Sequence, residues 1–175
     1  PQQNQETVTS DMPMAPTGIQ ERVQEFIGSM APTGQSCRVA LILPEDVEVV
    51  WPHVEDHIER SANRAEGELL PGDYLRFLID GQMHLWVAIE NNSVIAAMVT
   101  QVIVYPRKRS LRIIAVGGEG MERWQKFFPM LESFASSLNC TCLEAWGRKG
   151  WKKILKDWKS SYIVYTHELQ KKSIH

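Results

Sequence analysis

The residues with the clearest chemical potential form a short glycine-rich loop. It reads Gly117-Gly-Glu-Gly120 and directly follows a β-branched run at residues 110–116. The residues after it are apolar at spacings of three and four, which predicts a helix. A strand that ends in glycines before a helix can bind an anionic ligand, because the backbone N–H groups there point toward the ligand. Anion binding is therefore the first function to consider.

The cysteine and histidine side chains give little indication of a reactive or metal-binding site. Cys140 and Cys142 lie two apart on a predicted strand and share a face, so a disulfide between them would be strained. We expect buried, reduced thiols. The five histidines are scattered, and no Cys and His spacing is typical of a zinc site. We predict no metal site, and we expect His53 and His57 at the surface.

Charge is distributed unevenly along the chain. Residues 1–36 carry four acidic side chains and one basic one, whereas residues 147–175 carry eight basic and two acidic ones. The last part could contact phosphates, with Trp146, Trp151 and Trp158 stacking on bases. However, the tryptophan spacing suits core burial and the whole chain has a net charge of −2. We therefore favour a solvated, lysine-rich helix surface and do not expect a nucleic-acid partner.

The rest of the chain predicts the elements that would position the loop. Alternation and β-branched runs indicate strands, and spacings of three and four indicate helices. In residues 110–116, Leu111, Ile113 and Ala115 should share one face. No apolar run is long enough to span a membrane, and the polar start of the chain does not resemble a secretory signal. The predicted strands are 38–43, 84–90, 94–105, 110–116, 140–146 and 162–169, and the predicted helices are 47–64, 68–79, 124–138 and 150–158.

Residues 1–36 differ from the globular part at 37–175. They contain the pentapeptide Met-Ala-Pro-Thr-Gly twice, at residues 14–18 and 30–34, on either side of a short amphipathic helix. This segment is either a flexible linker or an arm that docks on a repetitive partner. We favour the docking arm, which forms its own unit beside the domain. Its predicted partner-binding residues are Met14, Pro16, Ile19, Val23, Phe26, Ile27, Met30 and Pro32.

The order of predicted elements over residues 37–172 resembles the GNAT (GCN5-related N-acetyltransferase) fold. The phrase LWVAIENNSVIAAMV is similar to the paired second and third strands of that fold, and CTCLEAWGRKGWKKILKDW to its fifth strand and following helix. The resemblance implies an α/β (α+β) fold, in which helices flank a mixed, mostly antiparallel central sheet.

The resemblance also implies where a cofactor would bind. In enzymes of this fold, pantetheine pairs with the edge of the fourth strand, and a Gln/Arg-x-x-Gly-x-Gly/Ala loop holds the pyrophosphate. The matching positions that would bind acetyl-CoA are Ile114, Val116, Gly118, Gly120 and Met121. The 3′-phosphate would lie near Arg148, Lys149 and Lys152.

The sequence departs from that pattern in three ways. The leading Gln or Arg is missing, and Glu119 would repel a pyrophosphate by roughly a few kcal/mol. The fourth strand offers no carboxylate base, and Leu155 stands where these enzymes place an acidic tyrosine. Glu144 and Tyr162 are the substitutes that we consider, although each is more simply a strand residue. We therefore assign no catalytic residue and expect no cofactor.

The degenerate loop and the phrase LEAWGRKGW also resemble small GNAT-like proteins of tailed, particularly short-tailed, bacteriophages. That resemblance implies a virion protein made in the host cytoplasm. Its arm would attach to an oligomeric portal, adaptor or tail ring, or to an internal protein, and the chain itself could form a ring. We predict a non-catalytic structural protein, with an acyl-CoA-dependent N-acetyltransferase as the alternative.

Overall fold

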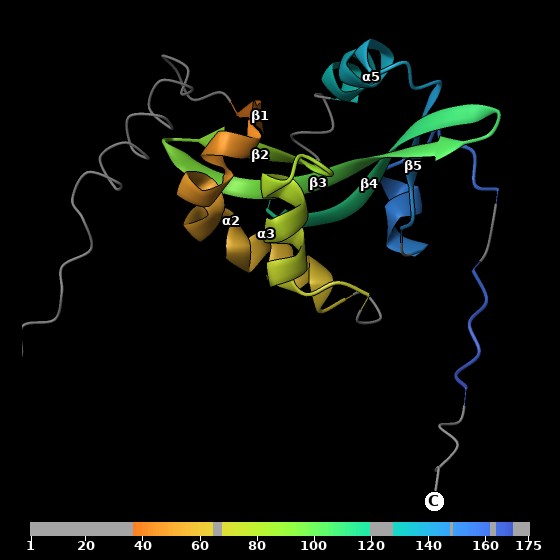
Figure 1. The fold of residues 1–175 in the computed structure, drawn as a ribbon, viewed down its shortest axis with the longest axis horizontal. Coiled ribbons are helices and arrows are strands. Elements are labelled where there is room, and N and C mark those ends of the chain that lie inside the picture. The colour runs from red at the N-terminus through yellow and green to blue at the C-terminus, as the bar shows by residue number, and fades with distance from the viewer. Residues whose placement is uncertain (1–36, 65–67, 120–127, 148, 162–163, 170–175) are drawn as a thin grey trace, which may run out of the picture.

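The computed structural model describes residues 37–64, 68–119, 128–147, 149–161 and 164–169. The docking arm predicted at residues 1–36 lies outside this part of the chain. Figure 1 shows a twisted sheet with α2 and α3 on one side and α5 on the other. The elements are β1 Arg38–Ile42, η1 Pro44–Asp46, α2 Val47–Ala62, α3 Pro71–Ile79, β2 His84–Glu90, β3 Ser93–Tyr105, β4 Lys108–Gly118, α5 Phe128–Ser137, β5 Cys142–Ala145 and η3 Lys149–Lys153.

The five described strands form one sheet in the order β1-β2-β3-β4-β5. All neighbours are antiparallel except β4 and β5, which run parallel. Asn91 and Asn92 turn the β2–β3 hairpin with φ angles of 50° and 58°. Asparagine tolerates this left-handed conformation better than most residues, which is why a two-residue turn forms here. The mixed, mostly antiparallel sheet with flanking helices confirms the predicted fold class.

One core lies between the sheet and the two N-terminal helices. Val50, Val54 and Ile58 follow one another at four-residue spacing along α2 and are buried. They belong to the same cluster as Leu85 and Val87 of β2. An apolar stripe of this kind buries itself against an apolar sheet face, and it fixes α2 across the central strands.

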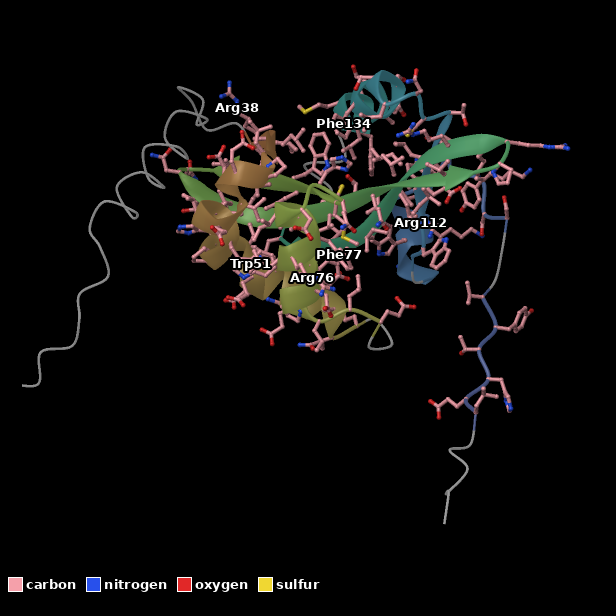
Figure 2. All side chains as sticks on the ribbon, in the orientation of Figure 1. Arg38, Trp51, Arg76, Phe77, Arg112 and Phe134 are labelled. Atoms are coloured by element: carbon pink, nitrogen blue, oxygen red, sulfur yellow. The ribbon has the colours of Figure 1, made fainter. Side chains whose placement is uncertain are left out.

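The opposite face of the sheet carries a second core under α5. Its buried members include Trp86, Met98 and Leu131. Phe134 lies edge-on to the Trp86 ring at a centroid distance of 5.0 Å (Figure 2). The indole N–H of Trp86 donates to Thr100 Oγ1 at 3.0 Å, so this buried donor is satisfied. Because β2 is covered on both faces, its sequence is an apolar run rather than an alternating one.

A β-bulge changes the predicted faces of β4. Val99 lies opposite Ala115 and Thr100 opposite Ile113, so Ile114 is an extra residue on β4. Ile113 consequently packs in the α5-side core, whereas Ala115 packs in the α2-side core. The prediction that these two residues share one face is wrong, because a bulge inserts one residue into the two-residue repeat.

The bounds of several predicted elements also change. The helix expected at residues 68–79 begins at Pro71, where the Asp73 carboxylate accepts the Leu70 N–H at 3.0 Å. The helix expected at 150–158 is a single 3-10 segment, Lys149–Lys153. Isolated turns give few hydrogen bonds for the residues they fix, so a short segment extends only where packing supports it. Of the helix expected at 124–138, the structure describes the part from Phe128 to Ser137.

The strand expected at residues 162–169 is not part of the sheet over the described residues 164–169. Val164, Tyr165 and Leu169 are 68%, 87% and 86% exposed. The edge strand β5 has only four residues and offers few backbone groups for pairing.

Candidate functional site

The open edge of β4 is the part of the sheet where a ligand could lie. β5 pairs with β4 only from Ser110 to Ile113. From the bulge at Ile114 onward, β4 continues to Gly118 with β3 as its single described strand neighbour. The two parallel strands therefore separate at the bulge, and the residues beyond it border an opening.

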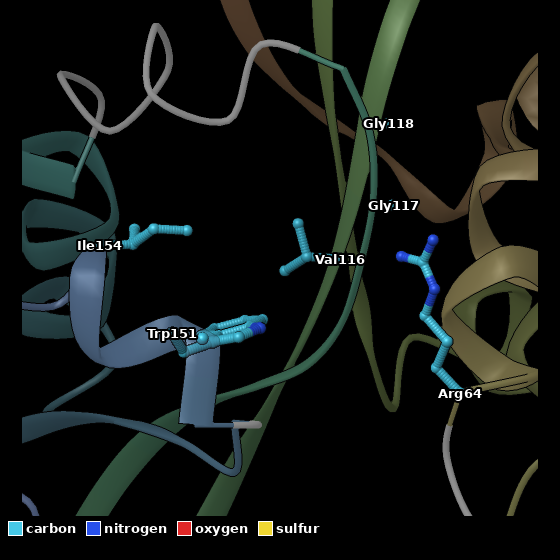
Figure 3. A pocket seen from close by; sticks show the side chains of 7 residues that line it. Arg64, Val116, Gly117, Gly118, Trp151 and Ile154 are labelled. Carbon is cyan, nitrogen blue, oxygen red and sulfur yellow. The ribbon is translucent and has the colours of Figure 1, made fainter.

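A pocket of about 290 Å³ occupies this opening. Figure 3 shows Arg64 on one side of the β4 end, with Trp151 and Ile154 on the other side, beyond Val116. Arg64 follows α2, and Trp151 belongs to η3, so elements far apart in the sequence meet here. The pocket joins a cation, a tryptophan ring and the backbone of Gly117 and Gly118.

The pocket has little capacity for proton transfer among the described residues that line it. Arg64 is their only ionisable side chain, and a guanidinium does not give up its proton at physiological pH. It can attract a phosphate or carboxylate, with which it forms charge-assisted hydrogen bonds. The lining therefore favours holding an anionic group over acid–base chemistry.

Two backbone donors near the pocket already have partners. The Val116 N–H donates to Ser61 Oγ of α2 at 3.2 Å. The Glu119 N–H donates to the Ile95 carbonyl at 2.9 Å. A ligand that pairs with the β4 edge or the glycine loop would have to replace both bonds, because each N–H group carries one proton.

The two glycines of the loop that the structure describes are required for packing. A Cβ added at Gly117 would lie 1.8 Å from the His57 carbonyl oxygen, so α2 rests directly on this residue. Gly118 has a φ of 127°, and a Cβ there would lie 2.4 Å from the Ala96 Cα. Glycine is therefore demanded at both positions by the protein's own backbone, irrespective of any ligand.

Of the five predicted cofactor residues, the structure describes Ile114, Val116 and Gly118. Val116 and Gly118 line the pocket, while Ile114 packs partly buried in the α2-side core. Gly120, Met121 and Arg148 lie outside the described residues. Lys149 and Lys152 lie in η3, next to the pocket residues Gly150 and Trp151.

Glu144, one of the two candidate catalytic residues, belongs to an ion-pair cluster at the other end of β4. Its carboxylate accepts from Arg112 Nη2 at 3.1 Å and from the Tyr105 hydroxyl at 3.2 Å, and it pairs with Lys108. Burial alone would raise the pKa of Glu144, but the hydrogen bonds from Lys108 and Arg112 outweigh it and hold the pKa below its ordinary value. A carboxylate stabilised in this way is a weak base.

The remaining predicted site residues are not placed together. Tyr162 and the arm residues Met14 to Pro32 lie outside the described part of the chain. Tyr165, the other tyrosine of that predicted strand, is exposed. Within the described residues, no three His, Cys, Asp or Glu side chains lie close enough to hold a metal ion. None of the described helices is long and apolar enough to cross a membrane.

Sequence reasoning missed Ser61 and Arg64. The contact of Ser61 with Val116 joins residues 55 apart in the chain. A serine and an arginine near the end of an amphipathic helix are ordinary surface residues in a sequence, so no local signal distinguishes them. Their role depends on where the bulge and the α2 stripe place the helix end.

Comparison with known proteins tests the fold. No protein-family model matches the chain, and no curated protein matches its sequence. A GCN5-related N-acetyltransferase from Ralstonia eutropha JMP134 is similar in structure, with a TM-score of 0.58 and 16% identity over 76% of this chain and 99% of that one. For a ribosomal-protein-alanine N-acetyltransferase from Brucella melitensis biovar Abortus 2308, the TM-score is 0.56 and the identity 10%, over 78% and 99%.

A third similar structure is an aminoglycoside acetyltransferase from an uncultured soil metagenomic sample, in complex with sisomicin. Its TM-score is 0.57 at 10% identity, over 77% of this chain and 97% of that one. Such low identities carry information on fold and not on activity. Residues 37–169, with the gaps given above, thus have the GNAT fold of known acetyltransferases.

Proposed function

We propose that this chain is a non-catalytic interaction protein, which uses the GNAT fold as a rigid body within a bacteriophage particle. The observation that supports the loss of acetyl transfer is the occupied backbone at the end of β4. The Val116 N–H is bonded to Ser61, and the Glu119 N–H is bonded to Ile95. The Val116 N–H, which a pantetheine on the β4 edge would need, is thereby used within the protein, as is the N–H of Glu119 in the glycine loop.

The side chains support the same conclusion. Glu119 is exposed beside the loop and repels phosphate groups. The described lining of the pocket includes no side chain able to accept a proton from an amine. Glu144 is fixed to two cations and a tyrosine at the opposite end of β4.

The place in a phage particle is supported by the resemblance of residues 143–151 to phage GNAT-like proteins and by the duplicated pentapeptide of residues 1–36. Two equivalent docking sequences suit a partner that presents the same pocket repeatedly, such as a portal or tail ring. Deletion of residues 1–36 should leave a folded domain that no longer enters particles. An insoluble deletion variant would instead place the arm in the core.

An acyl-CoA-dependent N-acetyltransferase is the second candidate. It is favoured by the pocket at the open β4 edge, where Arg64 offers a cation to an anionic ligand. In this reading, acetyl-CoA would supply the acyl group. Val116, Gly118 and Trp151 would line its binding cleft, and Arg64 would orient one of its anionic groups.

Calorimetric titration with acetyl-CoA and with CoA separates the two candidates. We expect no binding by the wild type, and weak binding by Glu119→Gly, which removes the negative charge. Glu168→Gly removes an equally exposed carboxylate outside the cleft and should not bind. Micromolar binding by the wild type would contradict the non-catalytic assignment and would call for an acetylation assay with amine acceptors.

A further inference from the structure

The tip of the β3–β4 hairpin carries a second surface, far along the sheet from the core between α2 and the central strands. Figure 1 shows this hairpin extending past the helices. Figure 2 shows Arg112 toward the hairpin end of the sheet and Trp51 of α2 toward the opposite end. Residues 104–109 are all exposed, and they include three consecutive cations. We call five residues the hairpin surface: Tyr105, Arg107, Lys108, Arg112 and Trp146.

Contacts place four of these residues on one face, and the fifth, Arg107, directly precedes Lys108 in the exposed tip. Tyr105 lies opposite Lys108 in the β3–β4 register. Lys108 and Arg112 both pair with Glu144 of β5. The Arg112 guanidinium lies over the Trp146 ring, 4.0 Å from its centroid. The surface therefore combines three cations and two aromatic rings around one acid.

Trp146 is the unusual member, because it is 66% exposed although tryptophan is usually well buried. The structure separates it from Trp151 and Trp158, which pack partly buried in the α5-side core. The sequence-based prediction of core burial is thus wrong for Trp146. One ring face is covered by Arg112, and the indole remains largely open to solvent.

The guanidinium that lies over the ring is held firmly. Arg112 Nη2 donates to the Tyr105 hydroxyl at 2.6 Å, and Arg112 Nε donates to Glu144 at 3.3 Å. The Arg112 side chain is only 12% exposed. A guanidinium fixed by two partners gives the indole a fixed plane on which to stack. Stacking on Arg112 favours one position of the Trp146 ring, and this lowers the entropy that is lost when a base stacks on it.

The combination of open rings and cations fits one class of ligand. We propose that the hairpin surface binds single-stranded nucleic acid, with bases stacking on Trp146 and Tyr105 and phosphates pairing with Arg107 and Lys108. Every base has a π-face and every nucleotide carries a negative charge, so both features are used together. An acidic peptide would use the cations and leave the indole in water. A duplex keeps its bases stacked on one another. This surface is independent of the pocket at the other end of β4.

Fluorescence anisotropy with a labelled oligothymidylate tests the proposal on the full chain at low salt. We expect the wild type to bind the single strand, and Trp146→Ala to weaken binding by about tenfold, the typical loss for one stacking ring. Trp146→Phe, which keeps a ring, should retain most of the affinity. Tyr165→Ala removes a ring outside the surface that is even more exposed, at 87%, and should change nothing.

The cations are tested by Arg107→Gln, which should weaken binding and reduce the slope of log affinity against log salt by about one. Arg76→Gln on α3 is the matched control, since its side chain is 65% exposed outside the hairpin surface. Three results would overturn the proposal: no binding of the single strand, equal loss in Trp146→Ala and Tyr165→Ala, or polyglutamate or duplex DNA binding as tightly as the single strand.

Discussion

The two ends of β4 differ in how they use the strand edge that faces away from β3. From Ser110 to Ile113, β5 lies along that edge, and Glu144 joins the two strands through Arg112 and Lys108. From Ile114 to Gly118, the edge meets the end of α2, and Ser61 accepts one of its N–H groups. The bulge at Ile114 separates these two regions.

This comparison shows that the pocket and the exposed rings and cations lie in different places along β4. Beside the pocket, Gly117 and Gly118 lie against the backbone of α2 and β3, and the N–H groups of Val116 and Glu119 are bonded to Ser61 and Ile95. The first region, where a sheet normally has only structural pairing, presents exposed rings and cations. Function should therefore be sought at the hairpin end.

The largest effect is expected for Gly117→Ala. Its Cβ would lie 1.8 Å from a backbone oxygen of α2, which cannot move without shifting the helix. We expect the free energy of unfolding to fall by about 3 kcal/mol, the upper range for overpacking. Urea denaturation measures this loss. Gly150→Ala is the control, because no atom lies within 4 Å of the added Cβ, and it should be nearly neutral. Equal effects of the two variants would mean that α2 does not rest on Gly117.

A smaller effect is expected for Glu144→Gln at the other end of the strand. It leaves the poorly exposed Arg112 without its charged partner, which should cost about 2 kcal/mol at pH 7. Lys108 adds little, since it is 45% exposed.

The stability lost in Glu144→Gln should depend on pH, and the direction of this dependence can be derived. The folded-state pKa of Glu144 lies below its ordinary value of 4.5, so the carboxylate stabilises the fold above that pH. This contribution disappears as the pH falls through the folded-state pKa. The difference between wild type and Glu144→Gln should therefore be constant near neutral pH and should shrink in acid. Urea midpoints at several pH values check this, and a difference that grows in acid would contradict the assigned cluster.

The smallest effect is expected for Ser61→Ala, which leaves the Val116 N–H without its acceptor. We expect a loss of about 1 kcal/mol because the site is only partly buried. Ser137→Ala is the control, since its hydroxyl donates to the Phe134 carbonyl at an exposed helix end, where water can replace it. If Ser61→Ala costs no more than Ser137→Ala, the Val116 N–H must be solvated, and the β4 edge is open to a ligand after all.

Much of the fold could be predicted because its signals are local. The stripe of Val50, Val54 and Ile58 predicted α2, and the Asn91-Asn92 pair predicted the hairpin that joins β2 and β3. The C-terminal part was predicted less well. Residues 150–158 and 162–169 have the composition of a helix and a strand, but the short β5 and η3 provide little against which they could form.

Some features of the candidate site could likewise be predicted from the sequence, and others could not. Its glycines could be found by inspection of the sequence, and so could the charge of Glu119 and the lack of a carboxylate on residues 110–116. The groups that contact Gly117, Val116 and Glu119 could not be found in this way, because they belong to residues far away in the chain. Because glycine has no Cβ, the same pattern of glycines allows the close approach of either a phosphate or a helix.

The sequence by itself determined the order of most elements, the apolar faces of α2 and the central strands, and the departures from an acetyltransferase pattern. These properties follow from side-chain chemistry and from repeats of 3.6 and two residues. The tertiary structure alone decided that Ile114 forms a bulge, that Ser61 and His57 lie against the end of β4, and that Trp146 stays exposed over Arg112 while Trp151 and Trp158 are covered. The physical reason is that each of these features depends on contacts between residues far apart in the chain, and no local sequence pattern specifies such contacts.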